Sequence, residues 1–354
     1  MKVWFDVLTP KQVMFFRRAV EQLRRSGHEV LCTSRQYREA VELAQVIKLD
    51  LKLVGAHGGA GRYDKLRMSA GRTYELAQVA NDFAPDVAVT FSSPEAARVA
   101  FGLGIRHFVF NDSPHSEAVA RLTIPLASKV FCPWVVPASD WSKYGVVHGS
   151  VTRYRALDPA AWLKHEKSSE QSSGDGGHGR NGKNRRVIVR LEESKASYIA
   201  DKRLGTASFV DHFVETCHDS FEISFLCRYQ DQIDEVQARY GSKVNVFREV
   251  VRGTELLRSA DLFVGAGGTM TAEAALIGKP TISITPFSYH VEKYLVRAGL
   301  VKKATSPKML VRLAKTMISD EKYQVRQRRK AERILKWMED PTDRMIDAVT
   351  SVGL

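Results

Sequence analysis

Cysteine is scarce in this chain of 354 residues, which has four: Cys32, Cys132, Cys217 and Cys227, with no pair at CxxC spacing. The missing spacing excludes the common zinc-binding motifs. A chain of this length can bury two hydrophobic cores without disulfides. We therefore interpret the four cysteines as reduced core residues of a cytoplasmic protein, and we expect no bound metal.

Long hydrophobic runs are missing as well. The longest candidate, residues 124–138, is interrupted by Ser128, Lys129 and prolines, so the sequence predicts no membrane-spanning helix. The first residues, MKVWFD, are too few and too acidic to form the regions of a signal peptide.

Several enzyme signatures are also absent. No GxGxxG follows the first predicted strand, which excludes the usual nicotinamide and flavin fingerprint. The Walker, GxSxG, HExxH and DxD patterns are missing too. If the protein handles a diphosphate, we expect cations and a helix N-terminus to stabilise it without a metal.

Positive charge, in contrast, is in excess, because 53 lysines and arginines outnumber 40 acidic residues and the net charge is +13. Much of the excess lies in residues 302–336, and such a charge attracts polyanions. We interpret this stretch first as a solvated helix face. The sharper alternative is a patch that binds an anionic membrane surface or nucleic acid. Nucleic acid is disfavoured, because basic and aromatic residues are not interleaved.

Short strands alternate with amphipathic helices along both halves of the chain. The predicted strands span residues 3–7, 29–33, 49–54, 86–90, 107–110 and 129–132, then 187–191, 221–227, 244–247, 261–264 and 281–284. The predicted helices include residues 10–26, 35–47, 63–83, 321–338 and 341–352. This alternation predicts an α/β fold of two Rossmann-like domains, whose parallel sheets face each other across a cleft.

The same pattern predicts the domain boundaries. Residues 1–155 form an N-terminal domain and residues 187–320 a C-terminal domain. Residues 156–186 contain a hinge and a Gly/Ser-rich insertion, which we expect to be disordered because it has almost nothing to bury. Residues 321–354 form C-terminal helices, one of which could cross back to the first domain.

The sharpest local motif lies in residues 261–282, where an apolar strand ends in glycines and a helix begins. Gly267 and Gly268 let a ligand approach the backbone, and Thr269 is expected to cap the helix. Exposed amides together with the helix dipole suit a diphosphate. Glu273, one turn into the helix, can accept hydrogen bonds from sugar hydroxyls or only complement the dipole.

The stretch GGTMTAEAALIGKPTI resembles the sugar-nucleotide motif of GT-B glycosyltransferases, and it is similar to that of the non-hydrolysing UDP-N-acetylglucosamine 2-epimerases. The whole chain more closely resembles an archaeal GT-B-like family that carries a domain-of-unknown-function label. The segments that carry this resemblance are residues 6–11, 57–59, 93–105, 110–112, 189–190, 228–229 and 265–269. The insertion at 166–186 departs from the pattern, as does Gln12, where we expect histidine in relatives.

The resemblance implies a GT-B fold in which the second domain binds a nucleotide-diphosphate sugar. It also implies that the loop with Thr9 and Lys11, after the first strand, faces the acceptor and the donor phosphates. His57 follows the third predicted strand, and Ser93 and Glu95 follow the fourth. Each has a structural alternative: an exposed helix start for Lys11, a Gly-rich turn for His57 and a helix cap for Ser93.

Asn111, Asp112 and His115 follow the fifth predicted strand. A general base for an acceptor hydroxyl requires such a carboxylate or imidazole, so we predict Asp112 and His115 as base and orienter. The alternative is that Asp112 or Ser113 only caps the next helix.

In the second half, Arg190 and Arg228 leave two strands, and a guanidinium matches phosphate oxygens two at a time. Tyr289 follows the last predicted strand and could touch sugar or base. The residues that we predict to bind the nucleotide sugar are Thr9, Lys11, Arg190, Arg228, Gly267, Gly268, Thr269 and Glu273.

These patterns predict a metal-independent GT-B-type glycosyltransferase that uses a nucleotide-diphosphate sugar, expected to be a UDP-sugar, and no further cofactor. A UDP-N-acetylglucosamine 2-epimerase-like enzyme is one alternative. A non-catalytic protein that binds a nucleotide sugar or a polyanion is another. Because lipid-linked acceptors lie at membranes, a peripheral membrane location is compatible with the transferase.

Overall fold

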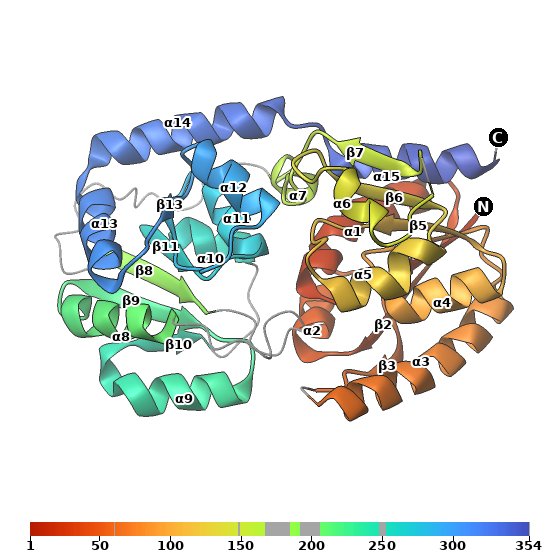
Figure 1. Cartoon of the computed structure of the whole chain (residues 1–354), viewed down its shortest axis with the longest axis horizontal. Helices are drawn as coiled ribbons and strands as arrows, with labels where there is room; N and C mark the ends of the chain where they lie inside the picture. Colours follow the sequence, from red (N-terminus) through yellow and green to blue (C-terminus); the bar gives the residue numbers. More distant parts are fainter. Residues whose placement is uncertain (60, 148, 167–184, 192–205, 248–252, 354) are drawn as a thin grey trace. The chain divides into compact units, whose positions relative to one another are not determined.

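The computed structural model describes residues 1–59, 61–147, 149–166, 185–191, 206–247 and 253–353. These residues divide into two compact units (Figure 1). Of the described residues, unit 1 contains 1–59, 61–147, 149–162 and 338–353, and unit 2 contains 163–166, 185–191, 206–247 and 253–337. Most of the predicted insertion, residues 167–184, lies outside the described residues.

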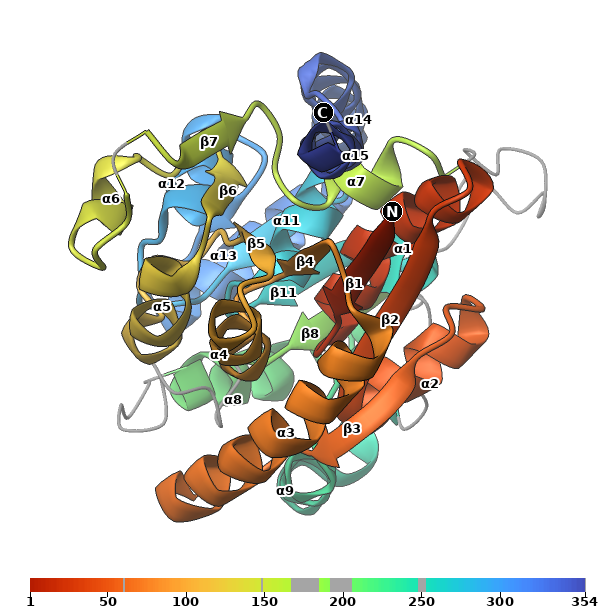
Figure 2. The ribbon, with the colours of Figure 1, turned by 90° about the vertical axis from the view of Figure 1, so that its right-hand side faces the viewer.

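Unit 1 is a parallel sheet of seven strands in the order β3-β2-β1-β4-β5-β6-β7. Helices α1 and α2 cover one face, and α3 and α4 cover the other (Figure 2). The elements are β1 (Lys2–Asp6), α1 (Pro10–Arg25), β2 (Glu29–Gln36), α2 (Arg38–Val46), β3 (Lys52–Ala56), α3 (Arg62–Phe83), β4 (Val87–Thr90), α4 (Pro94–Gly102), β5 (Arg106–Phe110), α5 (Glu117–Thr123), β6 (Lys129–Pro133), α6 (Ser139–Ser142), β7 (Val151–Tyr154), α7 (Ala160–Leu163) and α15 (Pro341–Thr350).

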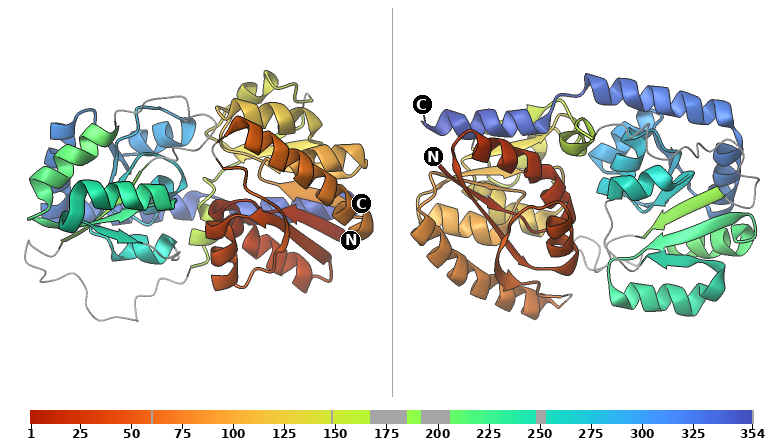
Figure 3. Two further views of the ribbon diagram at one scale, coloured as in Figure 1. Left: turned by 90° about the horizontal axis from the view of Figure 1, so that it is seen from below. Right: turned by 180° about the vertical axis from the view of Figure 1, so that it is seen from behind.

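The last helix, α15, belongs to unit 1 although it follows unit 2 in the chain. It packs against α1, and Figure 3 shows the two helices side by side. Arg18 of α1 forms an ion pair with Asp340. Asp340 also caps α15, because its carboxylate accepts a hydrogen bond from the Thr342 amide at 2.8 Å.

Unit 2 is a parallel sheet of six strands in the order β10-β9-β8-β11-β12-β13. Its elements are β8 (Arg185–Arg190), α8 (Thr206–Cys217), β9 (Phe221–Leu226), α9 (Gln230–Tyr240), β10 (Asn245–Phe247), α10 (Gly253–Ser259), β11 (Leu262–Gly265), α11 (Thr269–Leu276), β12 (Thr281–Ser283), α12 (His290–Arg297), β13 (Lys302–Lys303), α13 (Pro307–Ser319) and α14 (Glu321–Trp337). In both sheets the order reverses beside the first strand of the unit, at β1/β4 and at β8/β11.

The central strands are buried on both faces. On β8, Val187 and Val189 pack into one apolar cluster with Phe213, whereas Ile188 packs into the opposite cluster with Leu257. Successive side chains of a strand point to opposite faces, so a strand covered by helices on both faces must be apolar throughout. The predicted α/β class with two parallel sheets is confirmed, and all four cysteines are free and buried.

Several element boundaries differ from the prediction. The edge strands β7, with sequence VTRY, and β13, with sequence KK, were not predicted, because an edge strand has one neighbour and tolerates polar residues. Strand β2 continues to Gln36, so α2 begins at Arg38 and not at residue 35. Strand β8 begins at Arg185, two residues earlier than predicted. None of the described helices is both long and apolar enough to cross a bilayer.

Candidate active site

At the carboxyl edge of the unit 1 sheet, the segments that follow four strands bring together three charged side chains and one aromatic ring. Lys11 follows β1, Phe91 follows β4, Asp112 follows β5 and Asp158 follows β7. Ligands of open parallel sheets bind at this edge, beside the point where the strand order reverses. This part of unit 1 is therefore the candidate active site.

The Lys11 side chain contacts the residues that follow β4, β5 and β7. Its Nζ lies 2.6 Å from Oδ2 of Asp112, 2.6 Å from Oδ2 of Asp158 and 4.1 Å from the centroid of the Phe91 ring. The side chains of Lys11 and Asp112 are 16% and 20% exposed, whereas that of Asp158 is 2% exposed. We call Lys11, Asp112 and Asp158 the lysine–aspartate cluster. In this cluster the Asp158 carboxylate is buried, and the Asp112 carboxylate is partly accessible to solvent.

The loop after β1 is held by its own sequence. Pro10 begins α1, and Thr9 is the preceding cap residue, whose side chain makes no capping hydrogen bond. The Gln12 side chain accepts a hydrogen bond from the Leu8 amide at 2.6 Å and donates one to the Phe91 carbonyl at 3.3 Å. Gln12, at the position where we expected histidine, therefore ties the loop after β1 to the loop after β4.

Asp112 is held by its neighbours in sequence. Ser113 Oγ donates to Asp112 Oδ1 at 2.8 Å. Asn111 donates to Ser92 Oγ at 2.6 Å and accepts from the Ser113 amide at 2.6 Å. The cap residue of α5 is Ser116, so neither Asp112 nor Ser113 caps that helix. The alternative of a simple helix cap is thus wrong for Asp112.

Asp158 was missing from the predicted site. The Tyr154 hydroxyl, at the end of β7, donates to Asp158 Oδ1 at 2.5 Å. Strand β7 was not predicted, so the sequence analysis assigned Asp158 to the hinge and insertion, residues 156–186. The signal that could have located it was the run Val-Thr-Arg-Tyr at residues 151–154, which contains three strand-favouring residues and ends four residues before Asp158.

The two carboxylates of the cluster have divergent pKa values. Burial alone would raise the pKa of Asp112, but the Lys11 ammonium outweighs it and lowers the pKa to about 2. Burial raises the pKa of Asp158 to about 6, against the opposing effect of Lys11 and with a contribution from the Asp112 charge. Burial would lower the pKa of Lys11, but the two carboxylates raise it. The ionised form is thus favoured at Asp112, whereas burial favours the protonated form at Asp158.

His115, the predicted partner of Asp112, lies half-buried five residues beyond the end of β5. Asp112 accepts hydrogen bonds from Lys11 and Ser113, and its partnership with His115 stays a prediction.

Ser93, Glu95 and His57 lie at other points of the same edge. Ser93 caps α4 by accepting from the Ala96 amide at 3.3 Å, as the structural alternative predicted. Glu95 is buried and lies 3.5 Å from Arg72, which also binds Asp6 at 2.6 Å. The His57 ring stacks on Tyr37, and its Nδ1 accepts from the Gly59 amide at 3.0 Å.

Unit 2 places its glycine loop beside Arg190. Arg190 is the last residue of β8 and is the register partner of Gly265, and its carbonyl accepts from the Ala266 amide at 3.1 Å. Gly267 and Gly268 have φ of +96° and +81°, a region in which side chains are strained. Arg190 and the two glycines therefore lie together where the strand order of unit 2 reverses.

Helix α11 begins differently from the prediction. Gly268 occupies the cap position and Thr269 is the first helical residue, so Thr269 does not cap the helix. Glu273 is buried, and its carboxylate accepts a hydrogen bond from the Thr254 hydroxyl of α10. Thr254 was missing from the predicted set, because a helix–helix contact leaves no local signal in the sequence.

Arg228 and Tyr289 lie at the ends of other strands in unit 2. The Arg228 amide donates to the Gln232 side chain at 2.9 Å, just after β9. Tyr289 precedes α12 as its cap residue and stacks on Phe287, with ring centroids 5.4 Å apart.

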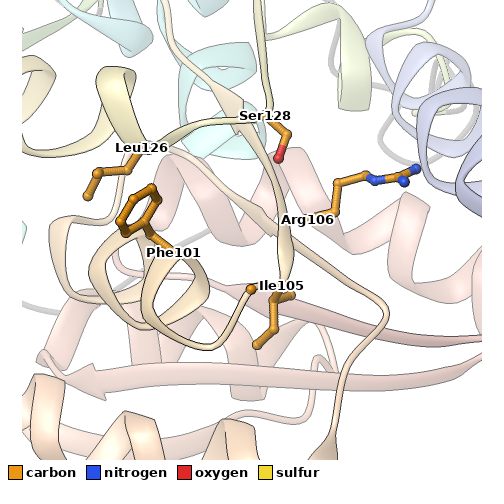
Figure 4. A pocket seen from close by; sticks show the side chains of 6 residues that line it. Phe101, Ile105, Arg106, Leu126 and Ser128 are labelled. Carbon is orange, nitrogen blue, oxygen red and sulfur yellow. The ribbon is translucent and has the colours of Figure 1, made fainter.

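A hollow of about 350 Å³ lies at the opposite edge of the unit 1 sheet, where β5 and β6 begin. Phe101 and Leu126 line one side of it, and Arg106 extends away from them (Figure 4). It is remote from the carboxyl ends of the strands and shares no residue with the lysine–aspartate cluster. In the described ranges, no three His, Cys, Asp or Glu side chains gather as a metal site would require.

Two units with parallel, order-reversing sheets define the class of the protein, which is the GT-B-like fold. Solved structures with this fold include S. aureus MnaA with UDP, 15% identical, with a TM-score of 0.76 and coverage of 99% of this chain and 96% of that one. The UDP-GlcNAc 2-epimerase of Neisseria meningitidis bound to UDP-GlcNAc is 15% identical, with a TM-score of 0.64 and 99% coverage of both chains. The spinosyn rhamnosyltransferase SpnG is 15% identical, with a TM-score of 0.63 and coverage of 99% and 100%.

The chain belongs to the DUF354 family, described as a protein of unknown function, which matches residues 1–353. One relative is the uncharacterized protein MJ0665 of Methanocaldococcus jannaschii, 24% identical over 366 residues that cover 99% of this chain and 98% of that protein. The predicted membership of a GT-B-like family with a domain-of-unknown-function label is confirmed.

Proposed function

We propose that this protein is an enzyme that transfers the glycosyl group of a nucleotide-diphosphate sugar to a hydroxyl acceptor. The observation that carries the proposal is the lysine–aspartate cluster, which brings a base and a proton-exchanging acid to the carboxyl edge of a parallel sheet. Solved structures of the same fold that contain UDP or UDP-GlcNAc support the substrate class, with a UDP-sugar as the first choice.

Unit 2 would bind the donor. The amides of Gly267 and Gly268 precede α11, and a helix N-terminus attracts a diphosphate. Arg190 ends the neighbouring strand β8, and its guanidinium donates to the Leu226 carbonyl at 3.1 Å. This guanidinium would add positive charge near the leaving group. Glu273, held by Thr254, would accept hydrogen bonds from sugar hydroxyls.

Unit 1 would supply the acid–base chemistry. The acceptor hydroxyl would donate a hydrogen bond to Asp112, the solvent-accessible carboxylate of the cluster. As the acceptor oxygen bonds to the anomeric carbon, the bond from that carbon to the diphosphate breaks and the nucleoside diphosphate leaves. The hydroxyl proton passes to the carboxylate pair, where Asp158 has a pKa of about 6 and can hold it. General-base catalysis of this kind typically contributes about 10²- to 10⁴-fold to the rate.

A nucleotide-sugar epimerase is the second candidate. Epimerisation requires one group that removes a proton and one that returns a proton, and carboxylates with divergent pKa values can serve as such a pair. Asp112, with a pKa of about 2, and Asp158, with a pKa of about 6, meet this requirement.

A panel of nucleotide sugars tests the proposal, with thermal shift reporting binding and chromatography reporting products. We expect one nucleotide sugar to raise the melting temperature of the wild type and of Asp112→Asn, but not of Glu273→Gln. Turnover should fall at least 100-fold in Asp112→Asn and stay unchanged in Asp50→Asn, an exposed aspartate of the same unit.

The products distinguish the candidates. A transferase releases nucleoside diphosphate when an acceptor extract is added, whereas an epimerase changes the sugar without any acceptor. If no nucleotide sugar shifts the melting temperature, both candidates are wrong. Binding without any turnover would identify a non-catalytic nucleotide-sugar-binding protein.

A further inference from the structure

Helix α14 has a continuous cationic side. It runs from Glu321 to Trp337, and Gln327 and Ala331 are its buried residues. The exposed side contains five basic residues at alternating spacings of four and three, which places them in one row on a helix. We call this row the cationic stripe: Lys322, Arg326, Arg329, Arg333 and Lys336. At 1.5 Å per residue the stripe is about 21 Å long.

The protein neutralises little of this charge. Arg326 lies 3.5 Å from Asp320, and both side chains are largely exposed. Within the described part of the chain, the other four residues of the stripe form no ion pair with an acidic side chain. Exposed charges of this kind contribute little to the stability of α14, so the packing of the helix does not explain the stripe.

Apolar side chains adjoin the stripe. Val325 is 45% exposed and lies one helical turn from Lys322 and Arg329. Trp337, one turn after Arg333, is 48% exposed at the end of the helix. In α14 these two apolar side chains flank the basic row, and helices that bind membrane surfaces use the same residue types, lysine and arginine with tryptophan and aliphatic side chains. Tryptophan rings favour the headgroup level of a bilayer.

We propose that the cationic stripe of α14 docks on an anionic bilayer surface. The five basic residues match the charge of phosphate headgroups, and Val325 and Trp337 enter the interface between headgroups and acyl chains. A nucleic acid would engage the charges but has no apolar layer for Val325, so the observations favour the membrane. This proposal does not depend on the reaction that the protein catalyses.

Vesicle flotation of the full chain tests the proposal, with phosphatidylcholine vesicles that contain or lack phosphatidylglycerol. Each basic residue near an anionic surface increases partitioning about fivefold, so Arg326→Gln/Arg329→Gln/Arg333→Gln should bind anionic vesicles about 100-fold more weakly than the wild type. The matched control is Lys308→Gln/Arg312→Gln/Lys315→Gln. It removes the same charge from three exposed positions of α13 that also lie three or four residues apart, and it should retain most of the binding. Equal melting temperatures would show that all variants are folded.

Trp337→Ser separates a membrane from other polyanions. It should weaken binding to anionic vesicles several-fold and leave the binding of a single-stranded RNA oligomer unchanged. Three results would overturn the proposal: no flotation of the wild type with anionic vesicles, equal losses in the α13 and α14 variants, or tighter binding to RNA than to vesicles.

Discussion

Replacement of Lys11 by methionine removes the one cation that lies between Asp112 and Asp158 in the cluster. Methionine keeps much of the length of the side chain, so the main change is electrostatic. Two carboxylates, one of them 2% exposed, then face each other without the ammonium that lies 2.6 Å from each. We expect Lys11→Met to destabilise unit 1.

The magnitude follows from burial. Removal of one partner of a buried ion pair costs about 3–5 kcal/mol. Because Lys11 and Asp112 are 16% and 20% exposed, water can solvate part of the uncompensated charge, and we expect a loss of about 2–4 kcal/mol in the free energy of unfolding near pH 8.

The loss should depend on pH. In the wild type, Asp112 has a lowered pKa of about 2, so its stabilisation is present above pH 4 and disappears as the pH falls toward 2. Asp158 has a raised pKa of about 6, so its protonated form favours folding below pH 4, and this contribution disappears as the pH rises through 6. Without Lys11 the pKa values of both carboxylates rise. The loss in free energy of unfolding that Lys11→Met causes should therefore be smaller at pH 5 than at pH 8.

Urea unfolding followed by tryptophan fluorescence measures the effect. Four of the five tryptophans, Trp4, Trp134, Trp141 and Trp162, lie in unit 1, and a Trp337→Phe background removes the fifth. Lys52→Met, at an exposed position of the same unit, is the control and should change stability by less than about 0.5 kcal/mol. If Lys11→Met is as stable as this control, or if its deficit is the same at pH 8 and pH 5, the electrostatic reasoning is refuted.

Two further predictions concern packing in each unit. Arg72→Leu leaves the fully buried Asp6 without the guanidinium that lies 2.6 Å away, so urea unfolding should show a loss of about 3–5 kcal/mol, and wild-type stability would contradict this. Gly278→Ala places a Cβ 2.7 Å from the Arg328 Cα, at a residue whose φ is +79°. The free energy of unfolding of unit 2 should therefore fall by about 2–4 kcal/mol, as reported by Trp337 fluorescence. An unchanged midpoint would show that α14 adapts to the added methyl group.

Much of the fold was predictable because its causes are local. The apolar run Val187-Ile188-Val189 predicts a strand buried on both faces, and the glycines at 265–268 predict a tight strand-to-helix connection. The edge strands β7 and β13 were not predictable in this way. Strand β13 consists of two lysines and β7 of only four residues, and both are strands because a neighbouring strand pairs with them.

In the candidate site, too, the sequence predicted the features with local causes, and tertiary contacts decided the others. The sequence alone determined that Lys11 and Asp112 follow strands of a parallel sheet, and so lie at one edge of it. Only the tertiary structure decided that these two side chains meet, and that Asp158, after an unpredicted strand, joins them behind Lys11. It also decided the divergent pKa values, because these depend on burial and on charges brought together from distant parts of the chain.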